Sequence, residues 1–321
     1  MSFEPDPRFT YKQAVSDFVS QPISATTRLC ALYGHPVKHS ASPAMQNTGL
    51  AALGLDWRYL AFDVAPPSLH IAIAGAKAMK FVGLNLTVPH KVAALEMVDV
   101  QDETAKTWGA INTIRFEAQT PDGGWAPLAE LPADEVKEIR SQGFNTDADA
   151  LVRSLQEDLG VRLAGARVLL LGAGGAGQVA ALKLAAEGVS ELFVVNRTSA
   201  KAQEIADDIR RRYPRANVTV GYPKEPVDLL LNGTSLGLKS SDPSPLDENQ
   251  FPLRKTGAVY DMIYRPAETP LLKGAKAAGG RTSNGLGMLL YQGAKALELW
   301  AGKSAPIQVM RTALERNVYG K

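Results

Sequence analysis

The chain has 321 residues, and its 35 basic and 33 acidic side chains leave a net charge of +2. So small a charge argues against a nucleic-acid-binding surface, and the composition is that of a folded globular protein of roughly two domains. One cysteine and four scattered histidines exclude a disulfide framework and favour no metal site. The sequence shows no leader-like segment and no apolar run of about 18 residues. We therefore expect a cytoplasmic protein that does not bind membranes.

The first half alternates strand-like and helix-like segments. Residues 1–27 are a polar extension with one short amphipathic patch. Strand, helix, strand, helix and strand patterns then follow at residues 29–34, 42–55, 57–64, 68–80 and 81–88. This order predicts a parallel sheet with helices on its faces. Residues 117–141, rich in Pro, Gly and Asp and ending in a short helical pattern, interrupt it as an insertion or long loop.

The second half begins with an amphipathic helix over residues 148–159, followed by an apolar strand, a glycine turn, a helix and the strand "ELFVVN". Further strand patterns lie at residues 217–221, 227–233 and 257–264. A long apolar helix starts near Gly285, and the tail from residue 306 is helical too. These patterns predict a second α/β domain.

The glycine turn "GAGGAG" places Gly172, Gly174 and Gly177 in the register G-x-G-x-x-G, directly after a strand and at the start of a helix. In that context the glycines let the backbone approach a pyrophosphate, whose charge is attracted by the free N–H groups of the helix. The turn therefore predicts a dinucleotide site. The alternative is a tight turn that packs a helix on a sheet and binds no ligand.

The strand after this turn ends at "NRT", where an NAD-binding fold would usually offer a carboxylate to the ribose. Arg197 stands there instead, and a guanidinium binds a 2′-phosphate with paired hydrogen bonds. Thr198 and Lys201 lie close enough in sequence to assist. The pattern favours NADP over NAD, unless Arg197 is simply a solvated surface residue.

Four polar motifs follow strand-like segments, at residues 39–43, 85–91, 109–113 and 143–147. Because ligands of open α/β sheets bind beyond the carboxyl ends of the strands, we expect these motifs to converge on a small polar ligand. Ser40 and Ser42 offer paired hydroxyl groups, although helix capping would explain Ser42 equally well. Asn85 and Thr87 have the spacing of two that points strand side chains to one face.

Lys91 and Asp147 are the lysine and the aspartate of these motifs. A lysine can give and take a proton if its pKa is brought toward neutrality, and a carboxylate can orient it. A carboxylate alone would raise the lysine pKa, so burial or a positive nicotinamide must act in the other direction. The alternatives are a solvated helix-start residue for Lys91 and a helix N-cap for Asp147.

The motifs taken together resemble those of the shikimate dehydrogenase family, which includes the quinate/shikimate dehydrogenases. The resemblance runs from about residue 29 to 315 and rests on "YGHPVKHSASPAMQN", "NLTVPHK", "GAINTI", "GFNTD", "GAGGAG", "NRT", "NGTSLG", "YDMIY" and "NGLGMLLYQGA". It implies an NADP-dependent, reversible reduction of 3-dehydroshikimate to shikimate in aromatic amino-acid biosynthesis. The implied fold is an N-terminal parallel-rich α/β substrate domain (residues 28–147 and 286–321) and a Rossmann NADP-binding domain (residues 148–285).

The resemblance also implies roles for individual residues. Lys91 and Asp147 look like the catalytic pair. The substrate would be held by Ser40, Ser42, Asn85, Thr87, Asn112, Tyr264 and Gln292. The cofactor site would be lined by Gly172, Gly174, Gly175, Ala176, Gly177, Asn196, Arg197, Thr198, Lys201, Thr234, Met262 and Gly285.

The sequence departs from the family pattern after Asp147, where Ala148 and Ala150 replace the usual small glycine-like positions and remove backbone freedom. The insertion at residues 117–141 is extra as well, so substrate choice stays open between shikimate, quinate and an amino analogue of shikimate. A non-catalytic NADP(H)-binding regulator is a further alternative. The oligomeric state, monomer or homodimer, is not fixed by the sequence.

Overall fold

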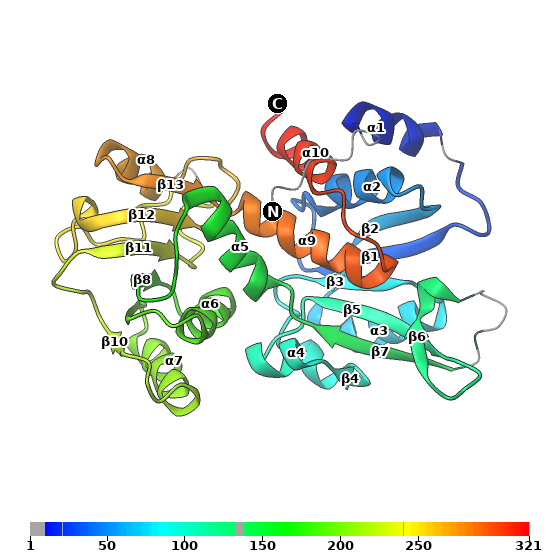
Figure 1. Cartoon of the computed structure of the whole chain (residues 1–321), viewed down its shortest axis with the longest axis horizontal. Helices are drawn as coiled ribbons and strands as arrows, with labels where there is room; N and C mark the ends of the chain where they lie inside the picture. Colours follow the sequence, from blue (N-terminus) through cyan, green and yellow to red (C-terminus); the bar gives the residue numbers. More distant parts are fainter. Residues whose placement is uncertain (1–9, 21, 132–135, 137, 240, 321) are drawn as a thin grey trace. The chain divides into compact units, whose positions relative to one another are not determined.

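The computed structural model describes residues 10–20, 22–131, 136, 138–239 and 241–320 (Figure 1). The chain divides into two compact units, one formed by Met1–Thr146 with Leu290–Lys321 and the other by Asp147–Leu289. The chain passes between the units at residues 146/147 and 289/290. The sequence placed the corresponding domain boundaries at residues 147/148 and 285/286.

The first unit is built on a seven-stranded mixed sheet in the order β2-β1-β3-β5-β7-β4, with β6 paired to β5. Its strands are β1 (Arg28–Gly34), β2 (Trp57–Asp63), β3 (Gly83–Leu86), β4 (Val100–Gln101), β5 (Thr113–Gln119), β6 (Trp125–Pro127) and β7 (Ile139–Phe144). Its α-helices are α1 (Tyr11–Ser20), α2 (Ser42–Ala52), α3 (Leu69–Ala78), α4 (Glu103–Trp108), the part of α9 (Leu286–Ala301) from Leu290 onward, and α10 (Ile307–Tyr319). Short 3-10 turns are η1 (Pro66–Ser68), η2 (Ala93–Glu96) and η3 (Leu128–Glu130).

Strands β2, β1 and β3 are parallel, as the alternating pattern predicts, whereas β5 runs antiparallel to both β3 and β7. The register pairs Asn85 of β3 with Thr113 at the start of β5, and Thr113 with Phe144 at the end of β7. The end of β3, the start of β5 and the end of β7 therefore lie side by side. This edge of the sheet is where polar side chains can gather.

Both faces of the sheet are covered. On one face, Leu69 and Ile73 of α3 belong to a buried apolar cluster with strands β1, β3 and β5. On the other face, the indole N–H of Trp300 in α9 donates to the carbonyl of Ile114 (2.9 Å), and a Cβ on Gly83 would lie 2.1 Å from that indole nitrogen. Gly83 is thus required for α9 to approach β3 closely.

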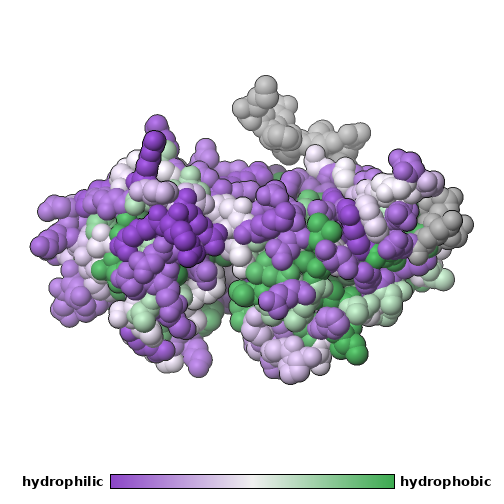
Figure 2. All heavy atoms as spheres, turned by 90° about the horizontal axis from the view of Figure 1, so that it is seen from below, coloured by the Kyte–Doolittle hydropathy of each residue, from purple (hydrophilic) through white to green (hydrophobic). Residues whose placement is uncertain are grey.

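The helix expected in the N-terminal extension is α1, which contacts α2 and α10 (Figure 1). Ala14 of α1 is 2% exposed and packs with Ala52 and Val309. The surface of the first unit carries hydrophobic patches among hydrophilic side chains (Figure 2), and Leu60 and Phe62 of the edge strand β2 are 45% and 40% exposed.

Part of the expected insertion is sheet. Residues 117–119 continue β5 and form a hairpin with β6, around a turn in which Gly123 has a positive φ of 83°. The short helical pattern expected at the end of residues 117–141 is wrong for its last residues, because Ile139–Ser141 belong to β7 and pair with β5. Cross-strand pairing outweighs a weak helical period there. Residues 132–135 and 137 lie outside the described part of the chain.

The second unit has a six-stranded, all-parallel sheet in the order β10-β9-β8-β11-β12-β13. Its elements are α5 (Asp147–Leu159), β8 (Arg167–Leu171), α6 (Gly175–Ala186), β9 (Glu191–Val195), α7 (Ser199–Arg212), β10 (Val218–Val220), β11 (Val227–Asn232), η4 (Leu253–Lys255), β12 (Thr256–Asp261), α8 (Pro270–Ala277) and β13 (Arg281–Asn284). Numbered from β8, this is the order 3-2-1-4-5-6 of a Rossmann fold, whose ligand site lies at the switch point between β8 and β11.

Candidate active site

The polar motifs of the first unit meet at the edge where β3 ends and β5 begins. The side chain of Asn85, 5% exposed, donates through Nδ2 to the carbonyl of Asn112 (3.2 Å) and to Oγ1 of Thr113 (3.0 Å). Its Oδ1 accepts from the hydroxyl of Tyr59 (2.8 Å). Tyr59 lies on β2 and was not among the expected site residues.

The network continues from Asn112 to the end of β7 and to α9. Asn112 Nδ2 donates to Oγ1 of Thr146 (2.9 Å) and, more weakly, to Oε1 of Gln292 (3.4 Å). The backbone N–H of Thr146 donates to Asn112 Oδ1 (2.8 Å), and its hydroxyl donates to the carbonyl of Gln292 (3.1 Å). Asn85, Asn112 and Gln292 are thus joined by hydrogen bonds, although they come from three separate segments of the chain.

The start of α2 carries the two serines. The N-cap position is Ala41, whose side chain makes no capping hydrogen bond. Ser40 Oγ accepts from the backbone N–H of Ser42 (3.2 Å), the first residue of α2. Ser42 is 7% exposed and does not occupy the N-cap position, so capping of α2 does not account for it.

The segment "NLTVPHK" is fixed at both ends. The N–H of Thr87 donates to the carbonyl of Tyr33 (2.9 Å), and the carbonyl of Lys91 accepts from the N–H of Ile111 (2.8 Å). Between them the Val88–Pro89 peptide is cis, and the buried His90 places Nε2 2.8 Å from the carbonyl of Val64. Burial lowers the pKa of His90, and the hydrogen bond to the Val64 carbonyl partly offsets this shift. Lys91 is half-buried, beyond the end of β3.

Asp147 is the first residue of α5 and is 7% exposed. It directly follows Thr146, so the hydrogen bonds of Thr146 fix the backbone that leads into this helix. Lys91 belongs to the first compact unit and Asp147 opens the second. Tyr264 also lies in the second unit, half-buried in the loop after β12. The pairing of Lys91 with Asp147 and the substrate role of Tyr264 therefore stay predictions.

In the second unit, the glycine turn lies at the carboxyl end of β8. Gly172 has a φ of +106°, and a Cβ there would lie 2.9 Å from Gly233 at the end of β11. A Cβ on Gly177 would lie 2.2 Å from the carbonyl oxygen of Gly172. These two glycines are required for the tight turn and for the close packing of α6 on the sheet.

Gly174 and Gly175 have a different environment. Both are exposed, and a Cβ on either would meet no described atom within 4 Å. Gly174 is the N-cap of α6, and no described side chain accepts from the first turn of this helix. The exposed N–H groups and the open space fit a pyrophosphate at the helix start, together with the exposed Ala176. Asn196 steadies the turn, since its Oδ1 accepts from the N–H of Ala173 (3.1 Å).

Arg197, Thr198 and Lys201 lie where β9 leads into α7, and all three are exposed. Asn196 Nδ2 donates to the carbonyl of Thr198 (2.9 Å), so one side chain joins the glycine turn to this second turn. The turn that carries Arg197 therefore lies beside the glycine turn, and residues 196–198 include no carboxylate.

The remaining expected cofactor residues are held by a buried network that the sequence did not predict. Asp261, which is fully buried at the end of β12, accepts from Nδ2 of Asn232 (2.9 Å) and from the hydroxyl of Thr269 (2.6 Å). Burial raises the pKa of Asp261, and the hydrogen bonds partly offset this. Asn232 Oδ1 in turn accepts from the N–H and the hydroxyl of Thr234 (2.9 and 2.8 Å).

Met262 and Gly285 meet beside this network. The N–H of Met262 donates to the carbonyl of Asn232 (3.0 Å). A Cβ on Gly285 would lie 2.0 Å from the carbonyl oxygen of Met262, so only glycine fits at that position. The only signal in the sequence for this network was the polar residue that ends each of two apolar strands, β11 and β12.

A cavity of about 440 Å³ lies elsewhere in the first unit, lined by residues of α1, α2 and α10 that include Tyr11, Phe18 and Arg316. Two further lining residues, Asn47 and Thr48, already use their side chains in bonds to Tyr59 and to the carbonyl of Ala44. The cavity therefore offers few polar groups to a ligand, and the hydrogen-bonded edge of the sheet is the stronger candidate site.

Two kinds of feature are absent from the part of the chain that the structure describes. None of the helices there is long and apolar enough to cross a membrane. No group of three or more His, Cys, Asp or Glu side chains among these residues is arranged to hold a metal ion. Cys30 is fully buried, and burial raises the pKa of its thiol.

Family models match three parts of the chain. Residues 32–114 match the "Shikimate dehydrogenase substrate binding domain", residues 154–219 match "Shikimate / quinate 5-dehydrogenase", and residues 285–315 match the "Shikimate 5'-dehydrogenase C-terminal domain". The chain is 41% identical over 301 residues to a "Shikimate dehydrogenase (NADP(+))" of Moorella thermoacetica, covering 91% of this chain and 94% of that protein. α1 lies outside all three matched ranges.

Solved structures similar to this chain lead to the same family as the sequence matches. A shikimate dehydrogenase crystallised with NADP+ superposes with a TM-score of 0.79 at 33% identity, over 93% of this chain and 98% of that one. The enzyme of Thermus thermophilus, crystallised with NADP(H) and shikimate, has a TM-score of 0.74 at 35% identity, over 91% of this chain and 100% of that one. With its two-unit architecture, its polar sheet edge and its Rossmann glycine turn, the chain belongs to the shikimate dehydrogenase family.

Proposed function

We propose that this protein is an NADP-dependent shikimate dehydrogenase that reversibly reduces 3-dehydroshikimate to shikimate. The observation that carries the proposal is the hydrogen-bonded edge of the first sheet, where Asn85, Asn112 and Gln292 are joined by hydrogen bonds. Such a cluster of neutral donors and acceptors matches a substrate made of hydroxyl groups and one carboxylate. The family membership supplies the reaction.

In this proposal the serines hold the carboxylate and the amides hold the ring hydroxyls. Ser40 and Ser42 lie at the start of α2, where the helix dipole adds a favourable field for an anion. Asn85, Thr87, Asn112 and Gln292 surround the ring from β3, β5 and α9. Tyr264 would approach from the second unit.

Lys91 is the proton donor in the reductive direction. NADPH, when bound, supplies the hydride to the carbonyl carbon. As the carbonyl oxygen gains charge, the ammonium group of Lys91 gives it a proton, which yields the hydroxyl group of shikimate and a neutral lysine. In the oxidative direction the neutral lysine takes the proton back. Asp147 orients the ammonium group and favours its charged form.

The cofactor site lies in the Rossmann unit. The exposed N–H groups near Gly174 and Gly175 would bind the pyrophosphate, with Gly172 and Gly177 shaping the turn. Asn196, Arg197, Thr198 and Lys201 would bind the 2′-phosphate and the adenosine ribose. Ala176, Thr234, Met262 and Gly285 would line the remainder of the site. Asp261 and Asn232 support this lining from behind.

The test is to purify the protein and follow NADPH formation with shikimate and NADP. Turnover that saturates in both substrates is the expected result. A protein that binds NADP but turns over neither shikimate nor quinate would instead support the regulator that the sequence left as an alternative. Quinate is the second candidate substrate, because residues 154–219 match a model that covers both activities. A cytoplasmic location and a monomeric or homodimeric state stay predictions.

A further inference from the structure

Gln46 is a fully buried amide on α2 for which no site role follows from the sequence. It is 0% exposed, and its Nε2 donates to the backbone carbonyl of Gly293 in α9 (2.8 Å). Because a carbonyl can only accept, the nitrogen of the amide must face Gly293. The Oε1 of Gln46 is buried too, and it accepts no hydrogen bond from the residues that the structure describes. The amide therefore joins two helices while its oxygen stays unsatisfied.

The bond from Gln46 is an addition to the hydrogen bonds of α9. A carbonyl inside a helix accepts from the N–H four residues farther on, so the Gly293 carbonyl has a partner in α9 without Gln46. The buried Oε1 carries a desolvation penalty, which an apolar side chain of similar length would avoid. We therefore expect Gln46 to contribute to the placement of α2 on α9 rather than to the free energy of unfolding.

Gln46 lies on the face of α2 that carries one of the proposed substrate serines. Residues four apart on a helix share a face, so Ser42 and Gln46 project from the same side of α2, and both are buried. On α9, a Cβ at Gly293 would lie 3.2 Å from Nε2 of Gln46 and 2.3 Å from Cε of Met45. The absence of a side chain at Gly293 gives the amide its room beside the backbone of α9.

The backbone of α9 is held at a second point next to this bond. The carbonyl of Gln292, the residue before Gly293, accepts from the hydroxyl of Thr146 (3.1 Å). Two consecutive carbonyls of α9 are thus tied to two other segments, one to α2 and one to the segment that follows β7. A shift of α9 along or around its axis at Gln292 would stretch one of these bonds.

We propose that Gln46 is a positioning residue for the substrate site: it sets the separation between Ser42 on α2 and Gln292 on α9. The inference rests on the proposed function, in which Ser42 contacts the substrate carboxylate and Gln292 a ring hydroxyl. A rigid ring meets both side chains only when the two helices are held at one spacing. A spacing that is fixed before the substrate arrives lowers the cost of ordering these groups on binding.

A methionine variant removes the amide and keeps an unbranched side chain of similar size. The matched control for Gln46→Met is Thr48→Val on the same helix. Thr48 is 8% exposed, and its hydroxyl also donates to a backbone carbonyl, that of Ala44 (2.8 Å), but this bond stays within α2. Any general effect of losing a buried side-chain hydrogen bond on α2 should appear in both variants.

The experiment measures kcat and KM for shikimate, the KM for NADP and the melting temperature of the wild type and both variants. Gln46→Met should raise the KM for shikimate about threefold to tenfold, the cost of ordering one side chain on binding, and leave the KM for NADP unchanged. Its melting temperature should equal or exceed that of the wild type, because an unsatisfied buried oxygen is removed. Thr48→Val should change none of the kinetic constants. A lower melting temperature of Gln46→Met with an unchanged KM would show a structural role alone and overturn the proposal.

Two further variants test the contact from α9. If Gln46 acts by placing Gln292, adding Gln46→Met to Gln292→Ala should raise the KM for shikimate no further. Gly293→Ala should raise this KM as well, because its Cβ would crowd the amide of Gln46. This variant keeps the test decisive if Gln46→Met does not fold.

Three results would each overturn the positioning role while the wild type still turns over shikimate. The first is an unchanged KM for shikimate in Gln46→Met, or in Gly293→Ala if Gln46→Met does not fold. The others are an equal rise in Thr48→Val and fully multiplicative effects in the double variant. A wild type without shikimate turnover would overturn the proposed function itself, and this inference with it.

Discussion

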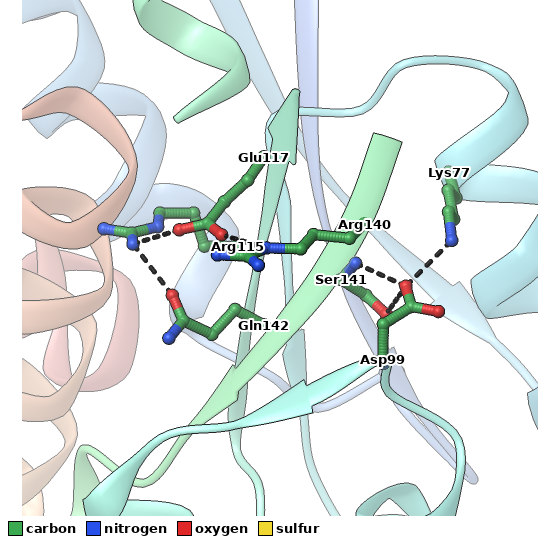
Figure 3. Close-up of polar contacts among 7 residues, drawn as sticks. All are labelled: Lys77, Asp99, Arg115, Glu117, Arg140, Ser141 and Gln142. Carbon is green, nitrogen blue, oxygen red and sulfur yellow. Dashed lines mark hydrogen bonds and ion pairs between the residues drawn. The ribbon is translucent and has the colours of Figure 1, made fainter. Parts of the chain in front are cut away.

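Two polar networks lie along the same strand, β5, and they differ in chemistry. At its start, Thr113 joins a neutral network of hydroxyl and amide groups with Asn85 and Thr146. Farther along, Glu117, 2% exposed, forms ion pairs with Arg115 and Arg140, and Arg115 also bonds Gln142 of β7 (Figure 3). The neutral network lies where strands end and chemistry is expected, whereas the charged one joins β5 to β7 near the hairpin.

The charged network resembles the neighbouring contact in which Asp99 binds Lys77 and Ser141 (Figure 3). Burial raises the pKa of Asp99, but the hydrogen bonds from Lys77 and Ser141 outweigh it and hold the pKa below its ordinary value. Each carboxylate here ties separate segments of the chain together. We therefore expect changes at the neutral edge to alter activity and changes at the charged network to alter stability.

Removal of the Lys91 side chain should have the largest effect. Lys91→Ala should lower kcat by about 10²- to 10⁴-fold, because no other group at that position delivers the proton. The melting temperature and the Kd for NADP, measured by calorimetry, should stay close to those of the wild type. Lys106→Ala is the control, because Lys106 is an exposed lysine that forms an ion pair with the exposed Glu103. Turnover of Lys91→Ala at the wild-type rate would refute the role of Lys91.

Glu117→Gln tests the other end of β5. It keeps the volume but leaves two arginines without their carboxylate, so the free energy of unfolding in urea should fall by about 3 kcal/mol, near the lower end for broken buried pairs because the arginines are partly exposed. The kcat of the folded protein should not change. Glu103→Gln, which breaks an exposed pair, should cost less than about 1 kcal/mol. A large loss of kcat at unchanged stability would reverse the distinction between the two networks.

Arg197 extends the comparison to an exposed charge for which a ligand is expected. Arg197→Ala should raise the KM for NADP by about 10-fold or more, since a charge-assisted hydrogen bond contributes about 1.5–3 kcal/mol, and leave the KM for NAD nearly unchanged. The loss should also shrink in high salt. Arg254→Ala on η4 serves as the control. Equal changes for NADP and NAD would place Arg197 outside the cofactor site.

The smallest effect concerns pH and His90. Burial holds the pKa of His90 below its ordinary value, so the unfolded chain takes up a proton at a higher pH than the folded protein does. The free energy of unfolding should therefore decrease as the pH falls through the ordinary histidine value of about 6.5, by at most about 1.4 kcal/mol per pH unit from this residue. In urea titrations, His90→Asn should show a shallower decrease between pH 7 and pH 5. An equal slope in both proteins would contradict this.

Local patterns predicted much of this structure, because their causes are local. The spacing of Gly172 and Gly177 between a strand pattern and a helix pattern predicts the turn after β8, and the structure shows why a Cβ fits at neither position. Tyr59 could not be found in this way, since its hydrogen-bond partner Asn85 lies 26 positions away along the chain. The strand pattern around Tyr59 shows only that a large side chain points to one face of the sheet.

Residues 139–141 were wrongly predicted to be helical, again because the interactions that decide their structure come from residues distant in sequence. Their helical period is real, but Ile139 and Arg140 gain backbone pairing with Ala118 and Glu117 and an ion pair with Glu117, none of which is visible locally. Asn232 and Asp261 were missed because each ends an apolar strand as a single polar residue. Only the parallel pairing of β11 with β12, which sets them opposite one another, makes them a network.

A kinetic matrix of two substrates and two cofactors tests the central claim most directly. The specificity constant kcat/KM is measured for shikimate and for quinate, each with NADP and with NAD, on the wild-type protein. The account predicts the highest value for shikimate with NADP, a lower one for shikimate with NAD because Arg197 loses its phosphate, and low values for quinate. A marked preference for quinate with NAD would contradict it.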